Sequence, residues 1–239
     1  MPPQLAYTPL ERLRVPRPVD RIEYLRRACV GKVVIDLGAM DETAYPAKRG
    51  TGTWVHEEIA KVATRVIGID SSLSVPTEGL RTGERSVIYR ADTQMLAGLV
   101  ESLQCEPDLI VAGELIEHLP NPLKFLQSIR ELPFLRGKTL LITTPNATAL
   151  HNALIALTER ESTHPDHLCI LSFKTLNTLF MRAGFADWEI LPYYSRFTEM
   201  EQRLRGLQRL LVTFSERTIN VGEWLFPMLA FGWVVKAKA

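Results

Sequence analysis

The sequence predicts an α/β protein built on a doubly wound, mostly parallel, seven-stranded sheet with an antiparallel edge strand. Five short runs are apolar at nearly every position instead of alternating, which is typical of parallel strands buried on both faces. Segments with helical periodicity separate these runs, as expected when crossover helices wind a sheet. Two further strand-like runs near the end of the chain complete the predicted sheet.

The first elements follow an irregular arm. Residues 1–18 hold several prolines and show little periodicity. A helix is expected from Val19 to Ala28, where apolar residues recur at helical spacing. The buried strands expected next are residues 32–37, 65–70, 86–90, 108–112 and 139–143. Between them we expect helices at 53–64, 94–103 and 123–131, and a loop or short helix at 72–83.

The regular alternation of strands and helices ends after Thr144. The expected order is then helix, helix, strand, basic amphipathic helix and strand, at residues 147–157, 173–183, 188–194, 199–217 and 227–236. The last two strands can form the antiparallel edge, because only the excursion between them separates them. No repeat or linker divides the chain. We therefore predict one domain over residues 1–239, with 145–170 and 193–225 as insertions around the sheet.

Composition excludes several classes of protein. The 28 Lys and Arg residues nearly balance the 27 Asp and Glu residues, so the net charge of +1 disfavours nucleic acid as a partner. The three scattered cysteines predict neither a disulfide framework nor a cysteine-built zinc site, and they fit a reducing compartment. We expect a cytoplasmic protein, because no signal-peptide h-region and no apolar run long enough for a transmembrane segment occurs.

Carboxylates and glycines follow the predicted strands where each strand ends. Ligands of open α/β sheets bind beyond the carboxyl ends of the strands, at the point where the strand order reverses. A glycine there lets a ligand approach the backbone closely, and an acid at the second strand end suits the two hydroxyls of a ribose. The candidate ligand-binding residues at this edge are Asp36, Gly38, Asp70, Ser71, Asp92, Thr93, Gly113 and Glu114.

These strand ends give the chain a resemblance to a known family. The segments that carry it are Val-Val-Ile-Asp-Leu-Gly (33–38), Val-Ile-Gly-Ile-Asp (66–70), Ala-Asp-Thr (91–93) and the run 108–119, with later stretches at 172–176 and 183–185. Over about residues 20–190 the chain resembles the class I S-adenosylmethionine-dependent methyltransferases. The resemblance implies a Rossmann-like methyltransferase fold, S-adenosylmethionine as cofactor, and methyl transfer as the reaction.

The resemblance also implies individual cofactor roles. The first motif of the family wraps the methionine part of the cofactor, which assigns that part to Asp36 and Gly38. The ribose falls to Asp70 and the adenine amino group to Asp92. Because 34 residues separate Asp36 from Asp70, we expect an insertion within residues 41–52. A dinucleotide-binding oxidoreductase is the rival on this fold, but G-x-G-x-x-G is absent after the first strand.

The residues after the fourth strand are the candidate catalytic and metal-binding groups. Glu114, Glu117 and His118 share one face if the segment turns helically. In one interpretation His118 is a general base near neutral pH and Glu114 contacts the acceptor. In another, Glu114, Glu117, His118 and His167 bind Mg²⁺ or another divalent metal, as the similar E-x-x-E-H pattern does in ubiquinone-pathway and small-RNA methyltransferases. In the third, Glu117 and His118 only cap the following segments.

The sequence leaves the methyl acceptor open. The arm and the two insertions surround the expected acceptor side and mix aromatic residues with arginines, which suits a small metabolite or a saccharide. A basic stripe on residues 199–217 is either a solvated helix face or a contact for an anionic substrate or membrane surface; it consists of Arg203, Arg205, Arg209 and Arg217.

We therefore expect an O-methyltransferase of a small metabolite or saccharide hydroxyl. Methylation of RNA or of a quinone is the alternative within the enzymes, and a non-catalytic cofactor-binding subunit is the alternative outside them. The oligomeric state is open.

Overall fold

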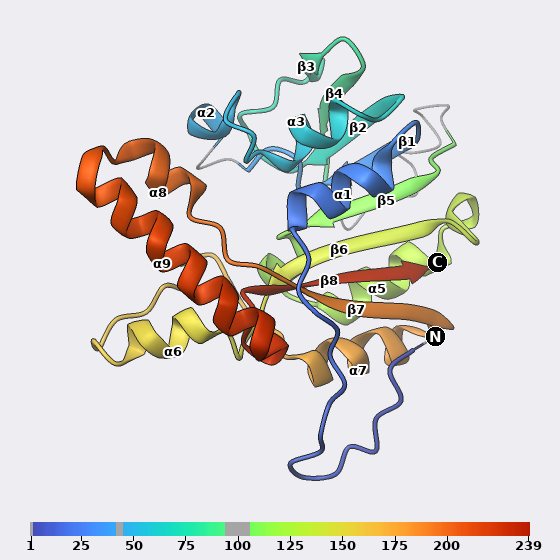
Figure 1. The fold of residues 1–239 in the computed structure, drawn as a ribbon. Coiled ribbons are helices and arrows are strands. Elements are labelled where there is room, and N and C mark those ends of the chain that lie inside the picture. Colours follow the sequence, from blue (N-terminus) through green and yellow to red (C-terminus); the bar gives the residue numbers. More distant parts are fainter. Residues whose placement is uncertain (1, 42–44, 94–105) are drawn as a thin grey trace.

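The computed structural model of the chain describes residues 2–41, 45–93 and 106–239, and the helix expected at 94–103 lies outside them. Its strands form one eight-stranded sheet in the order β3-β4-β2-β1-β5-β6-β8-β7 (Figure 1). The strands are β1 (Val33–Leu37), β2 (Arg65–Asp70), β3 (Leu80–Gly83), β4 (Ser86–Arg90), β5 (Leu109–Gly113), β6 (Thr139–Pro145), β7 (Asp187–Tyr193) and β8 (Gly232–Lys238). The helices are α1 (Arg21–Cys29), α2 (Tyr45–Lys48), α3 (Val55–Ala60), α5 (Pro122–Glu131), α6 (Leu150–Ala156), α7 (Phe173–Ala183), α8 (Thr198–Arg203) and α9 (Gly206–Leu225), with 3-10 turns η1 (Ile116–His118), η2 (Pro133–Leu135) and η3 (Pro227–Leu229).

The central strand of the sheet is β1, which is parallel to β2 on one side and to β5 on the other. Val34 of β1 pairs with Val66 of β2 and with Leu109 of β5. The chain runs outward from β1 through β2 to β4, and it then returns to β5 and β6 on the opposite side. The strand order therefore reverses between β1 and β5, which is where a doubly wound sheet binds its ligand.

Helices cover both faces of the sheet and bury alternate side chains of the central strands on opposite sides. Ile35 packs in one cluster with Phe125 of α5 and Phe180 of α7. Val34 packs in the other cluster with Leu25 of α1. The predicted doubly wound, mostly parallel sheet is confirmed.

The boundaries of α7 show how local sequence fixes an element. Ser172 Oγ accepts a hydrogen bond from Thr175 N, and Thr175 Oγ1 accepts one from Ser172 N, which is a capping box. Gly184 ends the helix at φ +82°. The irregular N-terminal arm packs against this helix, where Asn177 Nδ2 donates to Tyr7 Oη at 3.0 Å.

Two segments differ from the sequence prediction. Residues 72–83 contain β3, which pairs antiparallel with β4, so the sheet has eight strands instead of seven. The helix expected at 199–217 is two helices, because Leu204 and Arg205 are extended and Gly206 has φ +56°. The edge strand β3 is therefore antiparallel to its neighbour, and so is β8, which lies between β6 and the other edge strand β7. Within the described ranges, no helix combines the length and the apolar character needed to cross a membrane.

Candidate active site

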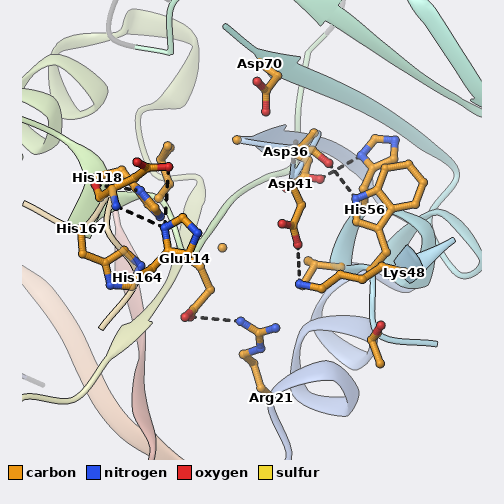
Figure 2. A pocket seen from close by; sticks show the side chains of 18 residues that line it. Arg21, Asp36, Asp41, Lys48, His56, Asp70, Glu114, His118, His164 and His167 are labelled. Atoms are coloured by element: carbon orange, nitrogen blue, oxygen red, sulfur yellow. Dashed lines mark hydrogen bonds and ion pairs between the residues drawn. The ribbon is translucent and has the colours of Figure 1, made fainter. Parts of the chain in front are cut away.

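A cavity of about 460 Å³ lies at the carboxyl edge of the sheet, where the strand order reverses between β1 and β5. Figure 2 shows that residues from the ends of β1 and β2 line one side and that a histidine cluster lines the other. The predicted site residues that line the cavity are Asp36, Gly38, Asp70, Gly113, Glu114, His118 and His167.

The turn after β1 requires a glycine. Gly38 has φ +72°, in the left-handed region that favours this residue. A Cβ at this position would lie 3.1 Å from Leu115 Cδ1, in the segment after β5. Gly38 N also donates to Ile69 O at 2.9 Å. The glycine therefore lets the chain after β1 pass close to the chain after β5, directly beside the cavity.

Asp36 is buried at the end of β1 and is paired with a histidine that sequence reasoning left out of the site. Its Oδ2 lies 2.9 Å from His56 Nδ1, and His56 Nε2 lies 2.9 Å from Thr82 Oγ1. Burial raises the pKa of Asp36, while the hydrogen bond to His56 acts in the opposite direction. Both Asp36 and His56 line the cavity, so His56 orients the carboxylate there.

Asp70 ends β2 and fixes the loops on either side of it. Its Oδ2 accepts a hydrogen bond from Met40 N at 2.8 Å, and its Oδ1 accepts one from Ser72 N at 2.9 Å. Each carboxylate oxygen has a second lone pair. Asp70 therefore keeps acceptor capacity for ligand hydroxyls while it holds the loop after β1 in place.

Three predicted cofactor residues lie outside the cavity lining. Ser71 and Asp92 are exposed, and Thr93 is buried. They follow the ends of β2 and β4, which lie side by side because Asp70 pairs with Arg90. The residues that follow Thr93 directly are outside the described part of the chain.

Glu114 follows β5 in a backbone conformation that is unusual for a residue with a side chain, at φ +52°. Its Oε1 lies 3.1 Å from Arg21 Nη1 (Figure 2). The same oxygen accepts a hydrogen bond from Tyr193 Oη at 2.9 Å. Burial raises the pKa of Tyr193 well above its usual value, which keeps the hydroxyl a donor. The group of potential metal ligands found among the described residues does not include Glu114, whose Oε1 is paired with Arg21 and Tyr193 instead.

Glu117, His118 and His167 form a compact group whose spacing suits a metal ion. One potential ligand atom from each residue lies within 4.8 Å of the others. Glu117 is fully buried, and its Oε2 accepts a hydrogen bond from Thr144 Oγ1 at 3.0 Å. Glu117 Oε1 and His167 Nδ1 are buried without a hydrogen-bond partner among the described residues. Burial raises the pKa of Glu117 well above its usual value.

Backbone hydrogen bonds across a long sequence separation bring His167 to this group. The turn η1 presents Glu117 and His118 directly after β5. Leu168 N and Cys169 N both donate to Glu117 O, at 2.8 and 3.2 Å. The rings of His118 and His167 consequently lie 4.6 Å apart between centroids.

One nitrogen of His118 is left available by its hydrogen bonding. His118 Nδ1 lies 3.2 Å from Asp166 O, and a carbonyl oxygen only accepts, so Nδ1 carries the proton. The Nε2 atom therefore keeps its lone pair for a proton or a metal ion. His164 completes a cluster of three imidazoles on this wall, with its ring centroid 6.1 Å from that of His118 and 5.6 Å from that of His167.

Comparison with known proteins identifies the family of this chain. A family model described as a methyltransferase domain matches residues 19–190, which is most of the chain. The chain belongs to the methyltransferase-domain family. The expectation of a class I methyltransferase that uses S-adenosylmethionine is thereby confirmed, and with it the prediction of an enzyme. A search of curated proteins found no match.

Solved structures share the fold of this methyltransferase. A S-adenosylmethionine-dependent methyltransferase from Archaeoglobus fulgidus superposes with a TM-score of 0.52 at 17% identity, covering 91% of this chain and 92% of the other. The small RNA methyltransferase HEN1 gives 0.57 at 14% identity, and the 91% of this chain that is covered corresponds to only 25% of HEN1. The methyltransferase domain of bacterial CtHen1 gives 0.54 at 15% identity, covering 91% and 95%.

Sequence reasoning missed several side-chain contacts that shape the cavity of the methyltransferase. Arg21 and Tyr193, which hold Glu114, belong to α1 and β7 and carry no local motif. Lys48 Nζ lies 2.5 Å from Asp41 Oδ2, and both residues line the cavity. The only available signal for this pair was the expected insertion at 41–52, which marks the loop without indicating a role for any residue in it.

Proposed function

We propose that the protein transfers a methyl group from S-adenosylmethionine to a hydroxyl oxygen of a small metabolite or saccharide, assisted by a divalent cation. The observation that carries this proposal is the grouping of Glu117, His118 and His167, because its two histidines line the cavity that Asp36 and Asp70 also border. Hydroxyls are weak nucleophiles at neutral pH, so an oxygen acceptor needs a group that removes or shields its proton. This cluster supplies such groups.

The donor set fits a cation bound by one carboxylate and two imidazoles. Glu117 Oε1 and His167 Nδ1 lack hydrogen-bond partners in the described part of the chain, and a metal ion satisfies such buried acceptors. A mixed oxygen and nitrogen set favours Mn²⁺ or Zn²⁺ over Mg²⁺, which prefers oxygen ligands. A bound cation would polarise the acceptor hydroxyl. Asp166 O fixes the tautomer of His118, as outer partners of metal-binding histidines commonly do.

The cavity wall opposite the histidine cluster carries groups that suit the chemistry of S-adenosylmethionine. S-adenosylmethionine carries a sulfonium and an ammonium group but no phosphate, so carboxylates suit it and a glycine-rich phosphate loop is unnecessary. In this proposal Asp36 and Gly38 hold the methionine part and Asp70 accepts hydrogen bonds from the ribose. Asp92 would meet the adenine from the neighbouring strand end. The cavity volume lies within the range of small-molecule sites.

A small acceptor is favoured by the shape and charge around the cavity. The histidine wall and the Glu114–Arg21 ion pair leave one shared space for donor and acceptor. The net charge of +1 provides no protein-wide attraction for a polyanion. We accordingly place the enzyme among small-molecule O-methyltransferases. The three scattered cysteines fit a reducing compartment, so we propose that it acts in the cytoplasm, as a single domain.

Calorimetry and a methyl-transfer assay test this proposal. S-adenosylmethionine should bind the wild-type protein, and transfer to a panel of saccharides and phenolic metabolites should be lost after chelator treatment and restored by Mn²⁺. His118→Ala and Glu117→Gln should bind the cofactor normally but show no transfer. The proposal is wrong if transfer is unaffected by chelation and by both substitutions. Preferential methylation of a short RNA would assign the acceptor to the other class.

A further inference from the structure

The long helix α9 presents its apolar residues to solvent and its acidic residues to the protein. Glu216 Oε2 accepts from Phe197 N, and Glu223, which is fully buried, accepts from Ser195 N and Oγ. The opposite face carries apolar side chains that are about half or more exposed: Leu207, Leu210, Leu211, Phe214, Val221, Trp224 and Leu225. This polarity is the reverse of that of an ordinary surface helix.

Most of the exposed apolar residues lie along one stripe. Positions 207, 211, 214, 221 and 225 share one helix face by their helical spacing, and Thr218 is the one polar position between Phe214 and Val221 on that face. The stripe is about 27 Å long at 1.5 Å per residue. Phe214 is 69% exposed, and Phe226, directly after the helix, is 62% exposed. A stripe of this length with large aromatic residues marks an interaction surface.

The exposed charges of residues 203–226 are all positive, and Arg217 is the one on α9 that lies beside the stripe, because Arg209 shares the helix face of Glu216. Residues 203–226 contain four exposed arginines, which are Arg203, Arg205, Arg209 and Arg217. The two carboxylates of this segment, Glu216 and Glu223, are turned toward the protein and hydrogen-bonded there. The surface therefore combines apolar, aromatic and basic groups, which is the composition of helices that lie in the interface of an anionic bilayer.

We propose that α9 docks the enzyme on an anionic lipid surface, with the apolar stripe in the headgroup region and the arginines against lipid phosphates. Electrostatic complementarity selects this occupant. A second copy of the chain would bring two sets of exposed arginines together with no exposed carboxylate from residues 203–226 to neutralise them, which disfavours self-pairing. A bilayer accepts the whole length of a straight helix without a matching groove.

The docked helix would also lie beside the cavity. In α8, which packs on α9, Gln202 Nε2 donates to Thr51 O at 3.3 Å. Thr51 belongs to the loop that leads to Trp54 and Val55, two residues of the cavity lining. Binding of α9 to a bilayer would therefore bring the loop at the cavity close to the membrane surface.

Co-sedimentation of the full chain with vesicles tests the proposal. The protein should partition onto phosphatidylcholine vesicles that contain phosphatidylglycerol and much less onto phosphatidylcholine alone, and added salt should weaken the binding. Phe214→Ser should lower partitioning about tenfold, the effect of leaving one large apolar side chain unburied. Arg217→Gln should lower it about fivefold on anionic vesicles only. Leu73→Ser, at an 85% exposed leucine in the loop after β2, is the matched control and should change nothing.

Tryptophan fluorescence gives a second readout that does not depend on a variant. Trp224 is 47% exposed, whereas Trp54, Trp188 and Trp233 are buried, so brominated lipid should quench Trp224 selectively. The inference is overturned if neither vesicle binds the protein, or if Leu73→Ser weakens binding as much as Phe214→Ser. It is also overturned if light scattering shows a dimer that Phe214→Ser dissociates, because a second copy would then cover the stripe. None of these outcomes depends on the methyl-transfer assay.

Discussion

Replacing Glu117 by glutamine should stabilise the metal-free protein and abolish its response to cations. Glu117 is fully buried, and its Oε1 has no hydrogen-bond partner among the described residues. Leaving a buried acceptor unpaired costs about 1–3 kcal/mol, and an unpaired carboxylate costs more than an unpaired amide. The carbonyl oxygen of glutamine keeps the hydrogen bond from Thr144 Oγ1. We therefore expect Glu117→Gln to gain about 1 kcal/mol, or about 2–4 °C in Tm for a chain of this size.

A bound cation should make the wild-type protein more stable than Glu117→Gln. A metal ion present at about 100 times its Kd stabilises the folded state by about 2.7 kcal/mol, which corresponds to about 5–10 °C in wild type and to nothing in the variant. Thermal unfolding in chelator and in Mn²⁺ measures both effects. Glu58→Gln is the control, since Glu58 is also buried but pairs with Lys61 and Arg26, so its loss should destabilise the protein in both buffers. A variant less stable than wild type in chelator, or with an unchanged Mn²⁺ response, would contradict the role of Glu117 as an unpaired metal ligand.

Three further predictions concern other parts of the structure. Asp70→Ala should weaken S-adenosylmethionine binding about tenfold or more in calorimetry, because the cofactor's ribose and the Met40 amide both lose their acceptor; unchanged affinity would contradict the role of Asp70. Gly68→Ala should destabilise the protein by about 1–3 kcal/mol in urea unfolding, since its Cβ would lie 2.7 Å from Ile88 Cγ1 and 2.8 Å from Ala39 Cβ; a stable variant would mean that β2 can shift. Burial raises the pKa of the Cys29 thiol to about 12, so a thiol reagent at about pH 8 should leave Cys29 unmodified in the native protein. Modification should require unfolding or a pH that approaches this raised pKa, and mass mapping can show it.

The fold was largely predictable because its signals are local. β2 and β4 begin and end at the predicted residues, and α7 does so because Ser172 and Gly184 fix its ends. β3 was missed because it is a half-exposed edge strand with no apolar run. The break between α8 and α9 was missed because the sequence over residues 199–217 keeps a helical, amphipathic pattern. Hydrogen bonds from Arg196 and from the amide of Phe197 to Glu216 hold α9 against the segment before α8, and the local sequence does not indicate these contacts.

The position of the site was predictable from the sequence, but the orientation of its side chains was not. The ends of β1, β2 and β5 placed Asp36, Asp70 and the Glu114–His118 segment at one edge, since parallel strands end together. The direction of Glu114 depends on Tyr193, which is 79 residues away, and no local pattern encodes that contact. The same holds for α9, whose basic amphipathic sequence was evident but whose outward-facing apolar stripe depends on tertiary packing.

The proposed function requires that the cofactor and the cation cluster share one cavity. Proton relaxation of the S-methyl group of bound S-adenosylmethionine, measured with Mn²⁺ as a paramagnetic probe, tests it most directly. We expect strong relaxation enhancement in wild type that disappears in His167→Ala while the cofactor still binds. Binding of both Mn²⁺ and cofactor without any enhancement of the methyl relaxation would contradict it.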